Sequence, residues 1–172
     1  EVRLSGPYGR FVLKTGDDKH AILVGGGTGV APLKSMVRHA LEAGEYDGDL
    51  TLYAGGRTRA HLYDVDVFRA LADEYDEFTY RPCLSDETPE QVEADGEDPD
   101  DYAFGMVTDV IEADHAKLSG CRGYLCGPPQ MVDAALKTLM SRRLFPRDIF
   151  REDFFDESDK NSTGLKSPLI KR

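Results

Sequence analysis

Short apolar runs and longer segments of helical periodicity alternate along the chain. The apolar runs at 20–24, 50–54, 78–84, 123–126 and 148–154 predict strands. The segments at 32–43, 62–75, 106–115 and 129–143 predict helices. In the first of these, apolar residues recur at helical spacing at Leu33, Met36, Val37, Ala40 and Leu41. Pro32 suits the first turn of that helix, and Gly44 suits its end.

Strands that alternate with helices of about a dozen residues are typical of βαβ units, in which the strands run parallel. Right-handed crossovers then give a doubly wound α/β domain, with a five-stranded parallel sheet and helices on both faces. Ligands of such sheets bind beyond the carboxyl ends of the strands, near the point where the strand order reverses. Candidate functional residues are therefore those that directly follow a strand.

The first such segment is GGGTGVAP, at 25–32, between the first strand and its helix. Its glycines let the backbone turn tightly and approach a ligand closely. The helix that follows offers unpaired N–H groups to a phosphate, and Thr28 adds a hydroxyl. Val30 stands where a dinucleotide fingerprint has its third glycine, and Leu33 stands where a P-loop has glycine. By spacing alone, the segment is either a phosphate-binding loop or only a tight strand–helix turn.

The second segment is CGPP, at 126–129, after the fourth predicted strand. It places the thiol of Cys126 at the sheet edge that faces the ligand crevice, with prolines opening the next helix. Taken alone, Cys126 is equally explained as an ordinary buried cysteine.

Composition narrows the function classes. The 172 residues are 40% apolar and 31% charged, which is typical of a globular domain. A net charge of −11 repels phosphate backbones, so nucleic acid is not expected as a partner. The apolar runs are too short to cross a bilayer, so no membrane association is expected either.

The three cysteines favour a reducing cytoplasm, because their number is odd and no secretory segment is present. Cys121 and Cys126 have the first spacing of a plant-type ferredoxin motif, but Pro129 occupies the position of the next cysteine. No metal site is therefore predicted in this chain.

The segment 86–101 carries nine carboxylates and no basic residue. Such a composition buries too little apolar surface to fold alone, so an acidic loop is predicted at 86–104. It is either a solvated insertion or a docking surface for a basic partner.

The chain resembles the nicotinamide domain of the ferredoxin–NADP reductase superfamily. Five motifs carry the resemblance in order: GPYGRF (6–11), GGGTGVAP (25–32), YAGGRTRAHLY (53–63), YLCGPPQMV (124–132) and IFREDF (149–154). It is most similar to reductase components of bacterial multicomponent monooxygenases, of the phenol hydroxylase, methane and propane type. These pass a hydride from NAD(P)H to FAD, then single electrons to a two-iron cluster and on to a di-iron hydroxylase.

This resemblance implies a division of the chain into the end of a flavin domain and a linker (1–12), an NAD(P)-binding domain (13–155) and a C-terminal tail (156–172). The run that cradles FAD and a ferredoxin domain are absent from these residues, and the chain begins with Glu1. We therefore expect a piece of a longer polypeptide, in which another domain holds most of the FAD. The isolated chain is expected to be inactive.

The resemblance also assigns roles by position. Gly27 and Thr28 contact the nicotinamide end and the pyrophosphate, and Cys126 lies beside the reactive carbon of the nicotinamide and shapes its pocket. Glu152 orients the nicotinamide or flavin edge, and Phe154 packs at the flavin, unless it serves only to pack the last strand. The expected cofactor-binding residues are Gly25, Gly26, Gly27, Thr28, Gly29, Pro32, Gly56, Arg57, Arg59, Asp64, Gly127, Pro128 and Met131.

Cofactor choice depends on the residues after the second strand. Arg57 or Arg59 could bind the 2′-phosphate of NADPH, whereas the carboxylate of Asp64 suits the ribose hydroxyls of NADH. NADH is the expected cofactor, and NADPH is the alternative.

The expected partners are the flavin and ferredoxin domains of the same polypeptide and an oxygenase component. Three alternatives stay open: the reductase of a ring-hydroxylating dioxygenase, a stand-alone flavin reductase, and an isolated nucleotide-binding or interaction module without redox activity.

Overall fold

The computed structural model describes residues 3, 9–44 and 46–153. In these residues a parallel sheet of six strands runs in the order β4-β3-β2-β1-β5-β6. The strands are β1 (Ala21–Gly26), β2 (Leu50–Gly56), β3 (Phe78–Leu84), β4 (Ala103–Phe104), β5 (Arg122–Gly127) and β6 (Ile149–Asp153). The helices are α1 (Val30–Ala43), α2 (Val65–Glu74), α3 (Pro89–Ala94), α4 (Val107–Asp114) and α5 (Pro129–Ser141). Because β1 lies between β2 and β5, the strand order reverses at the β1–β5 boundary.

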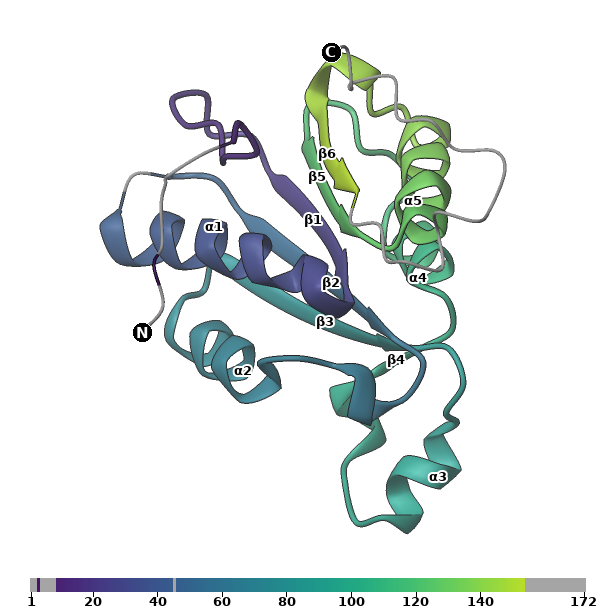
Figure 1. Ribbon diagram of the computed structural model, residues 1–172. Coiled ribbons are helices and arrows are strands. Elements are labelled where there is room, and N and C mark those ends of the chain that lie inside the picture. Colours follow the sequence, from purple (N-terminus) through teal and green to yellow (C-terminus); the bar gives the residue numbers. More distant parts are fainter. Residues whose placement is uncertain (1–2, 4–8, 45, 154–172) are drawn as a thin grey trace.

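The sheet is covered on both faces, as the sequence predicts. Helices α1 and α2 pack on one face, and α4 and α5 pack on the other (Figure 1). Strand β1 contributes side chains to the cores on both faces of the sheet, since Leu23 belongs to the core on the α1 side and Ile22 to the core on the α5 side. A strand buried on both faces is apolar along its length, which explains why the sequence shows one continuous apolar run in 20–24.

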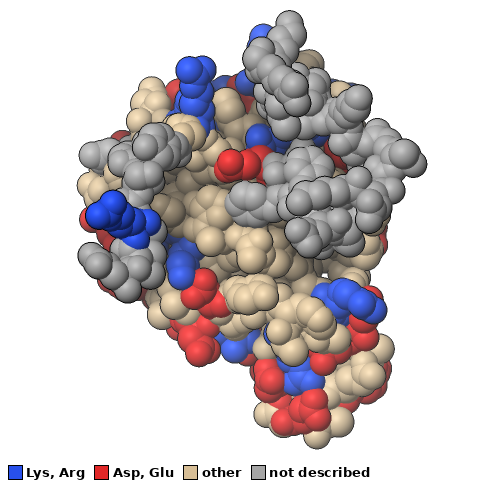
Figure 2. Space-filling model, viewed as in Figure 1, with Lys and Arg blue, Asp and Glu red and all other residues tan. Residues whose placement is uncertain are grey.

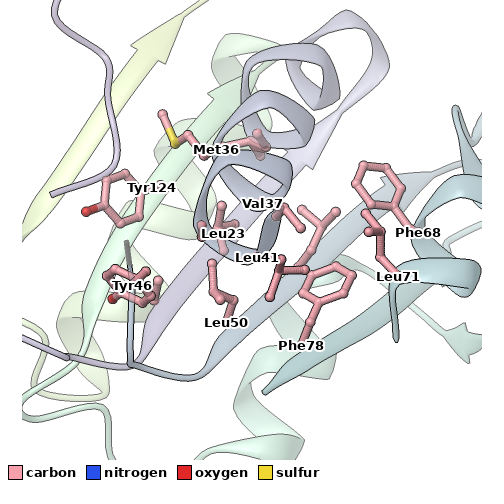
Figure 3. Close-up of a cluster of buried hydrophobic side chains, with 14 of the residues drawn as sticks. Leu23, Met36, Val37, Leu41, Tyr46, Leu50, Phe68, Leu71, Phe78 and Tyr124 are labelled. Atoms are coloured by element: carbon pink, nitrogen blue, oxygen red, sulfur yellow. The ribbon is translucent and has the colours of Figure 1, made fainter. Parts of the chain in front are cut away.

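The core on the α1 side holds most of the large side chains. Val37 and Leu41 of α1 pack toward Leu50 of β2, and Phe68 of α2 stacks on Tyr80 of β3 with ring centroids 5.1 Å apart (Figure 3). These contacts fix both helices to the sheet and so position the turns between strands and helices.

The acidic segment differs from the prediction of a loop, and it adds the sixth strand. It forms α3 and then β4, which pairs with β3 through Cys83 and Leu84. A capping box at Thr88 and Gln91 starts α3, and Val92 is fully buried beside Leu84. The segment therefore has an ordered structure because it buries its few apolar residues against the end of β3.

Helix α2 begins at Val65, three residues after the predicted start at 62. Asp64 has a left-handed backbone (φ 56°), which cannot continue a helix. Helix α1 begins two residues before Pro32, because a short 3-10 turn at Gly27–Gly29 runs directly into it. Among the described residues, every helix is too short or too polar to cross a membrane.

Candidate functional site

Three glycine-bearing strand ends meet at the carboxyl edge of the sheet. Gly26 of β1 is the register partner of Gly55 on β2, and Gly25 is the partner of Cys126 on β5. This edge includes the β1–β5 boundary, where the strand order reverses. The fold therefore places the two motifs singled out in the sequence, GGGTGVAP and CGPP, side by side at the position where such sheets bind ligands.

The first motif needs its glycines because other backbone lies against it. A Cβ on Gly29 would come within 2.2 Å of the Cys126 carbonyl oxygen, and a Cβ on Gly26 within 3.2 Å of the Gly55 carbonyl oxygen. Gly127 has φ 149°, and its Cβ would be 2.9 Å from the Gly26 carbonyl oxygen. The edge is thus a bare-backbone cradle, in which neighbouring backbones pack so closely that Gly29 and Gly127 have no room for a side chain.

Met131, in the first turn of α5, lies over this cradle. Its thioether is the nearest group to a Cβ built on Gly26 (2.8 Å to Sδ) or on Gly127 (2.8 Å to Cε). Gly27, by contrast, has φ 56° and open space around it, and Thr28 is exposed. The cradle therefore has an apolar side at Met131 and an open, polar side at the start of α1.

The amino terminus of α1 points its N–H groups at this open side. Its N-cap residue, Gly29, has no side chain to cap them, and the described first turn holds no acidic residue. The Val30 N–H already donates to the Gly27 and Thr28 carbonyls, so what the 14-residue helix offers an anion is the positive end of its dipole, which favours phosphate. Pro32, half-buried in the first turn, removes one N–H that a ligand would otherwise need to satisfy.

Cys126 is fully buried and belongs to the core cluster on the α1 side. Its backbone forms the floor under Gly29, whereas its neighbour in the β5–β6 register, Glu152, is exposed. Both lie at the edge that the sequence predicted. Phe154 lies outside the described residues.

Arg59 is enclosed by carboxylates of the acidic segment. Its Nη2 lies 3.1 Å from Glu87 and also contacts Asp95, and its Nη1 donates to Glu97 at 2.7 Å. The Arg59 backbone N–H donates to Glu87 as well, at 2.6 Å. The hydrogen bonds from Arg59 lower the pKa of Glu87, so this carboxylate stays charged.

Arg57 is far more exposed than Arg59: 75% of its side chain is accessible, against 15%. It pairs with Asp86 through Nε at 2.8 Å. Figure 2 shows the result, a lower lobe in which red and blue side chains are interleaved where Figure 1 draws α3. Neither arginine is therefore unpaired in the described structure.

Asp64, the predicted ribose ligand, pairs with Lys34 of α1 at 2.8 Å and makes no side-chain cap on α2. The pair ties the two helices together on one face of the sheet. The sequence did not predict the partners of Arg59 and Asp64, because they lie about 30 residues away along the chain. The one feature of the sequence that pointed to partners for Arg59 was the excess of negative charge in 86–101.

In the residues that the structure describes, no group of three or more His, Cys, Asp or Glu side chains could hold a metal ion. The doubly wound sheet and its glycine cradle at a helix amino terminus define a dinucleotide-binding domain. The chain matches the family described as "Oxidoreductase NAD-binding domain" over residues 23–137, and it belongs to that family.

Relatives of the chain are similarly named. It is 39% identical over 173 residues to the reductase component DmpP of phenol 2-monooxygenase from Pseudomonas sp., covering 99% of this chain and 46% of that protein. It is 38% identical over 158 residues to the reductase component of propane 2-monooxygenase from Gordonia sp., covering 90% and 43%. The chain thus spans less than half the length of these relatives.

Among solved structures, the Amycolatopsis reductase GcoB is similar, with a TM-score of 0.74 and 40% sequence identity. The match covers 87% of this chain and 42% of that one. The ferredoxin reductase-like NAD-domain fold expected from the sequence is thereby confirmed.

Proposed function

We propose that this chain is the NADH-binding domain of an FAD-dependent reductase that supplies electrons to the hydroxylase of a multicomponent monooxygenase. The observation that carries this proposal is the bare-backbone cradle in front of the α1 amino terminus. The names of the relatives support the rest, since two of them are reductase components of monooxygenases.

The cradle fits a dinucleotide pyrophosphate. Gly25 to Gly29 bring backbone close to the ligand, and the positive end of the α1 dipole favours its charge. Thr28 adds an exposed hydroxyl on the open side. Gly56 continues the cradle toward the adenosine half of the molecule.

The other half of the dinucleotide lies over the end of β5. Gly127, Pro128 and Met131 form the surface against which a nicotinamide ring packs, and the Cys126 backbone supports the floor. The bound nicotinamide supplies a hydride for FAD. Glu152, exposed beside Cys126, orients the nicotinamide or flavin edge.

The remaining partners follow from the family resemblance and not from these residues. FAD is held mainly by a domain outside this chain, and a two-iron ferredoxin domain of the same polypeptide carries single electrons onward. An oxygenase component in the cytoplasm receives them. The oxygenase binds the organic substrate, so this domain does not determine it.

Nucleotide binding tests the proposal directly. The chain is titrated with NADH by isothermal calorimetry, beside a Gly27→Asp variant that would place a carboxylate in the open space at the start of α1. We expect one NADH per chain for the wild type and none for the variant. A folded wild-type chain that takes up no NADH at millimolar concentration would contradict the proposal.

A further inference from the structure

We propose that Glu87, Asp95 and Glu97 make this site selective for NADH, because they occupy the Arg59 guanidinium that would otherwise bind the 2′-phosphate of NADPH. The inference rests on the proposed function, since it concerns the adenosine end of the same site. It assigns a specificity role to three carboxylates of the acidic segment.

Arg59 lies at the adenosine end of the cradle. Strand β2 ends at Gly56, next to β1, and Gly55 is the register partner of Gly26. A pyrophosphate at the start of α1 leaves the adenosine half to extend over the end of β2. Arg59 follows that end within one short turn, so its guanidinium is suitably placed to meet a 2′-phosphate.

Each nitrogen of that guanidinium already has a carboxylate partner. Nε and Nη2 donate to Glu87, Nη2 also contacts Asp95, and Nη1 donates to Glu97. A phosphate would have to displace carboxylates from a side chain that is only 15% exposed. It would also enter a region in which three carboxylates surround one arginine, so the uncompensated charge repels a second anion.

The carboxylates are held in place before any nucleotide arrives. Glu87 precedes the capping box of α3, and the Arg59 backbone N–H fixes it at 2.6 Å. Glu97 accepts a hydrogen bond from the Tyr102 hydroxyl at 2.5 Å, which lowers the pKa of Glu97. Tyr102 packs in turn against Val92 and Leu84. The enclosure of Arg59 is therefore preorganised, and it is not a chance pairing of mobile surface charges.

Arg57 does not replace Arg59 as a phosphate clamp. Its Nε pairs with Asp86 at 2.8 Å, so a phosphate would have to displace a carboxylate there as well. The backbone N–H of Asp86 donates to the Arg57 carbonyl at 2.8 Å, which keeps the Asp86 carboxylate beside it. Carboxylates therefore lie beside both arginines, and their negative charge disfavours a phosphate at either one.

The test measures kcat/KM for NADH and NADPH in the full-length reductase. The test variant is Glu87→Gln/Glu97→Gln. Its matched control is Glu90→Gln/Glu93→Gln, which removes the same charge from α3 residues that have no ion pair with an arginine in the described structure. We expect the NADPH/NADH ratio to rise about tenfold or more in the test variant, because a charge-assisted hydrogen bond to the phosphate becomes available. The control should stay within about twofold of the wild type.

Adding Arg59→Ala to the test variant should abolish the gain. Competitive inhibition by 2′,5′-ADP and by ADP provides a second readout, and only 2′,5′-ADP should bind more tightly to the test variant. If double substitution also destroys NADH activity, Glu87→Gln alone is measured, because Gln retains the shape and an acceptor oxygen.

Three results would overturn the inference: an unchanged ratio, an equal rise in the control, or a rise that survives Arg59→Ala. A wild-type enzyme that oxidises neither nucleotide would instead contradict the proposed function, so the two failures are distinguishable.

Discussion

Cys126 and Glu152 are register partners on neighbouring strands, yet the first is fully buried and the second is exposed. The pair marks the boundary between the core and the ligand edge at the end of β5. A buried residue can still affect a reaction if its backbone and side chain position the surface against which the reacting group packs.

The substitution Cys126→Ala in the full-length reductase is expected to slow flavin reduction at saturating NADH about tenfold, while the fold is retained. Loss of an oriented contact in the transition state lowers the rate more than the affinity, and tenfold corresponds to about 1.4 kcal/mol. Stopped-flow absorbance at the flavin band measures the rate. Cys121→Ala, at a half-buried position outside the cradle, is the control. If the flavin of the Cys126→Ala variant is reduced at the wild-type rate, Cys126 serves only to pack the core.

The glycine cradle makes a stability prediction that is independent of catalysis. Gly29→Ala places a Cβ within 2.2 Å of a carbonyl oxygen, so we expect a loss of roughly 1–3 kcal/mol in the free energy of unfolding. Gly55→Ala is the matched control at the same edge, because its Cβ meets nothing closer than 3.5 Å. Urea denaturation followed by circular dichroism measures both. Equal effects of the two substitutions would show that the close approach at Gly29 is relieved at little cost.

The isolated chain should purify without colour and fail to reduce ferricyanide with NADH. The reason is that, in the function proposed above, residues outside this chain hold most of the flavin. Absorbance near the flavin bands and a ferricyanide assay provide the measurement, with the full-length reductase as the positive control. A yellow chain with one FAD per molecule would show that these residues suffice to hold the flavin.

Two histidines on the α4 side of the sheet predict how stability depends on pH. The Tyr53 hydroxyl donates to Asp114 at 3.0 Å and lies 2.9 Å from Nε2 of His115. The ring of His115 lies 6.0 Å from that of His20, which contacts the Thr51 hydroxyl. Burial lowers the pKa of both histidines, so the folded state favours their neutral forms.

Since these pKa values are lower in the folded state than in the unfolded one, the unfolded chain binds more protons as the pH falls below about 6.5. The free energy of unfolding should therefore be fully maintained above that pH and decrease below it. Urea titrations between pH 5.5 and 7.5 measure this slope, and His115→Gln should flatten it. A slope that is the same in the wild type and in His115→Gln would exclude this origin.

The sequence predicts the sheet well where the pattern is local. Residues 20–24 and 50–54 read as strands because both faces are buried, and the five strands it predicts are those that carry the core. It misses β4, because two residues are too few for any periodicity, and the pairing with Cys83 and Leu84 is set by tertiary contacts. It also starts α2 too early, since apolar spacing does not reveal the left-handed backbone of Asp64.

The position of the glycine motif is likewise predictable, because a run of glycines between a strand and a helix allows the tight turn that brings the chain from one to the other. The electrostatics are not. Whether Arg59 faces solvent, a phosphate or a carboxylate depends on how the chain folds back after β3. Charge counts along 86–101 indicate an excess of carboxylates, but they do not indicate which arginine these meet.

The acidic segment leaves the sheet at Leu84 and returns to it at Ala103, and the Gly105 N–H just after β4 donates to the Leu84 carbonyl at 2.8 Å. Since its two ends already meet, the insertion can be exchanged, lengthened or shortened without disturbing the register of the strands that carry the core. The preference for NADH over NADPH would then depend on an insertion that can be replaced as a unit. Exchanging this segment between related reductases offers a way to change their coenzyme preference without changing the residues at the ends of β1 and β5.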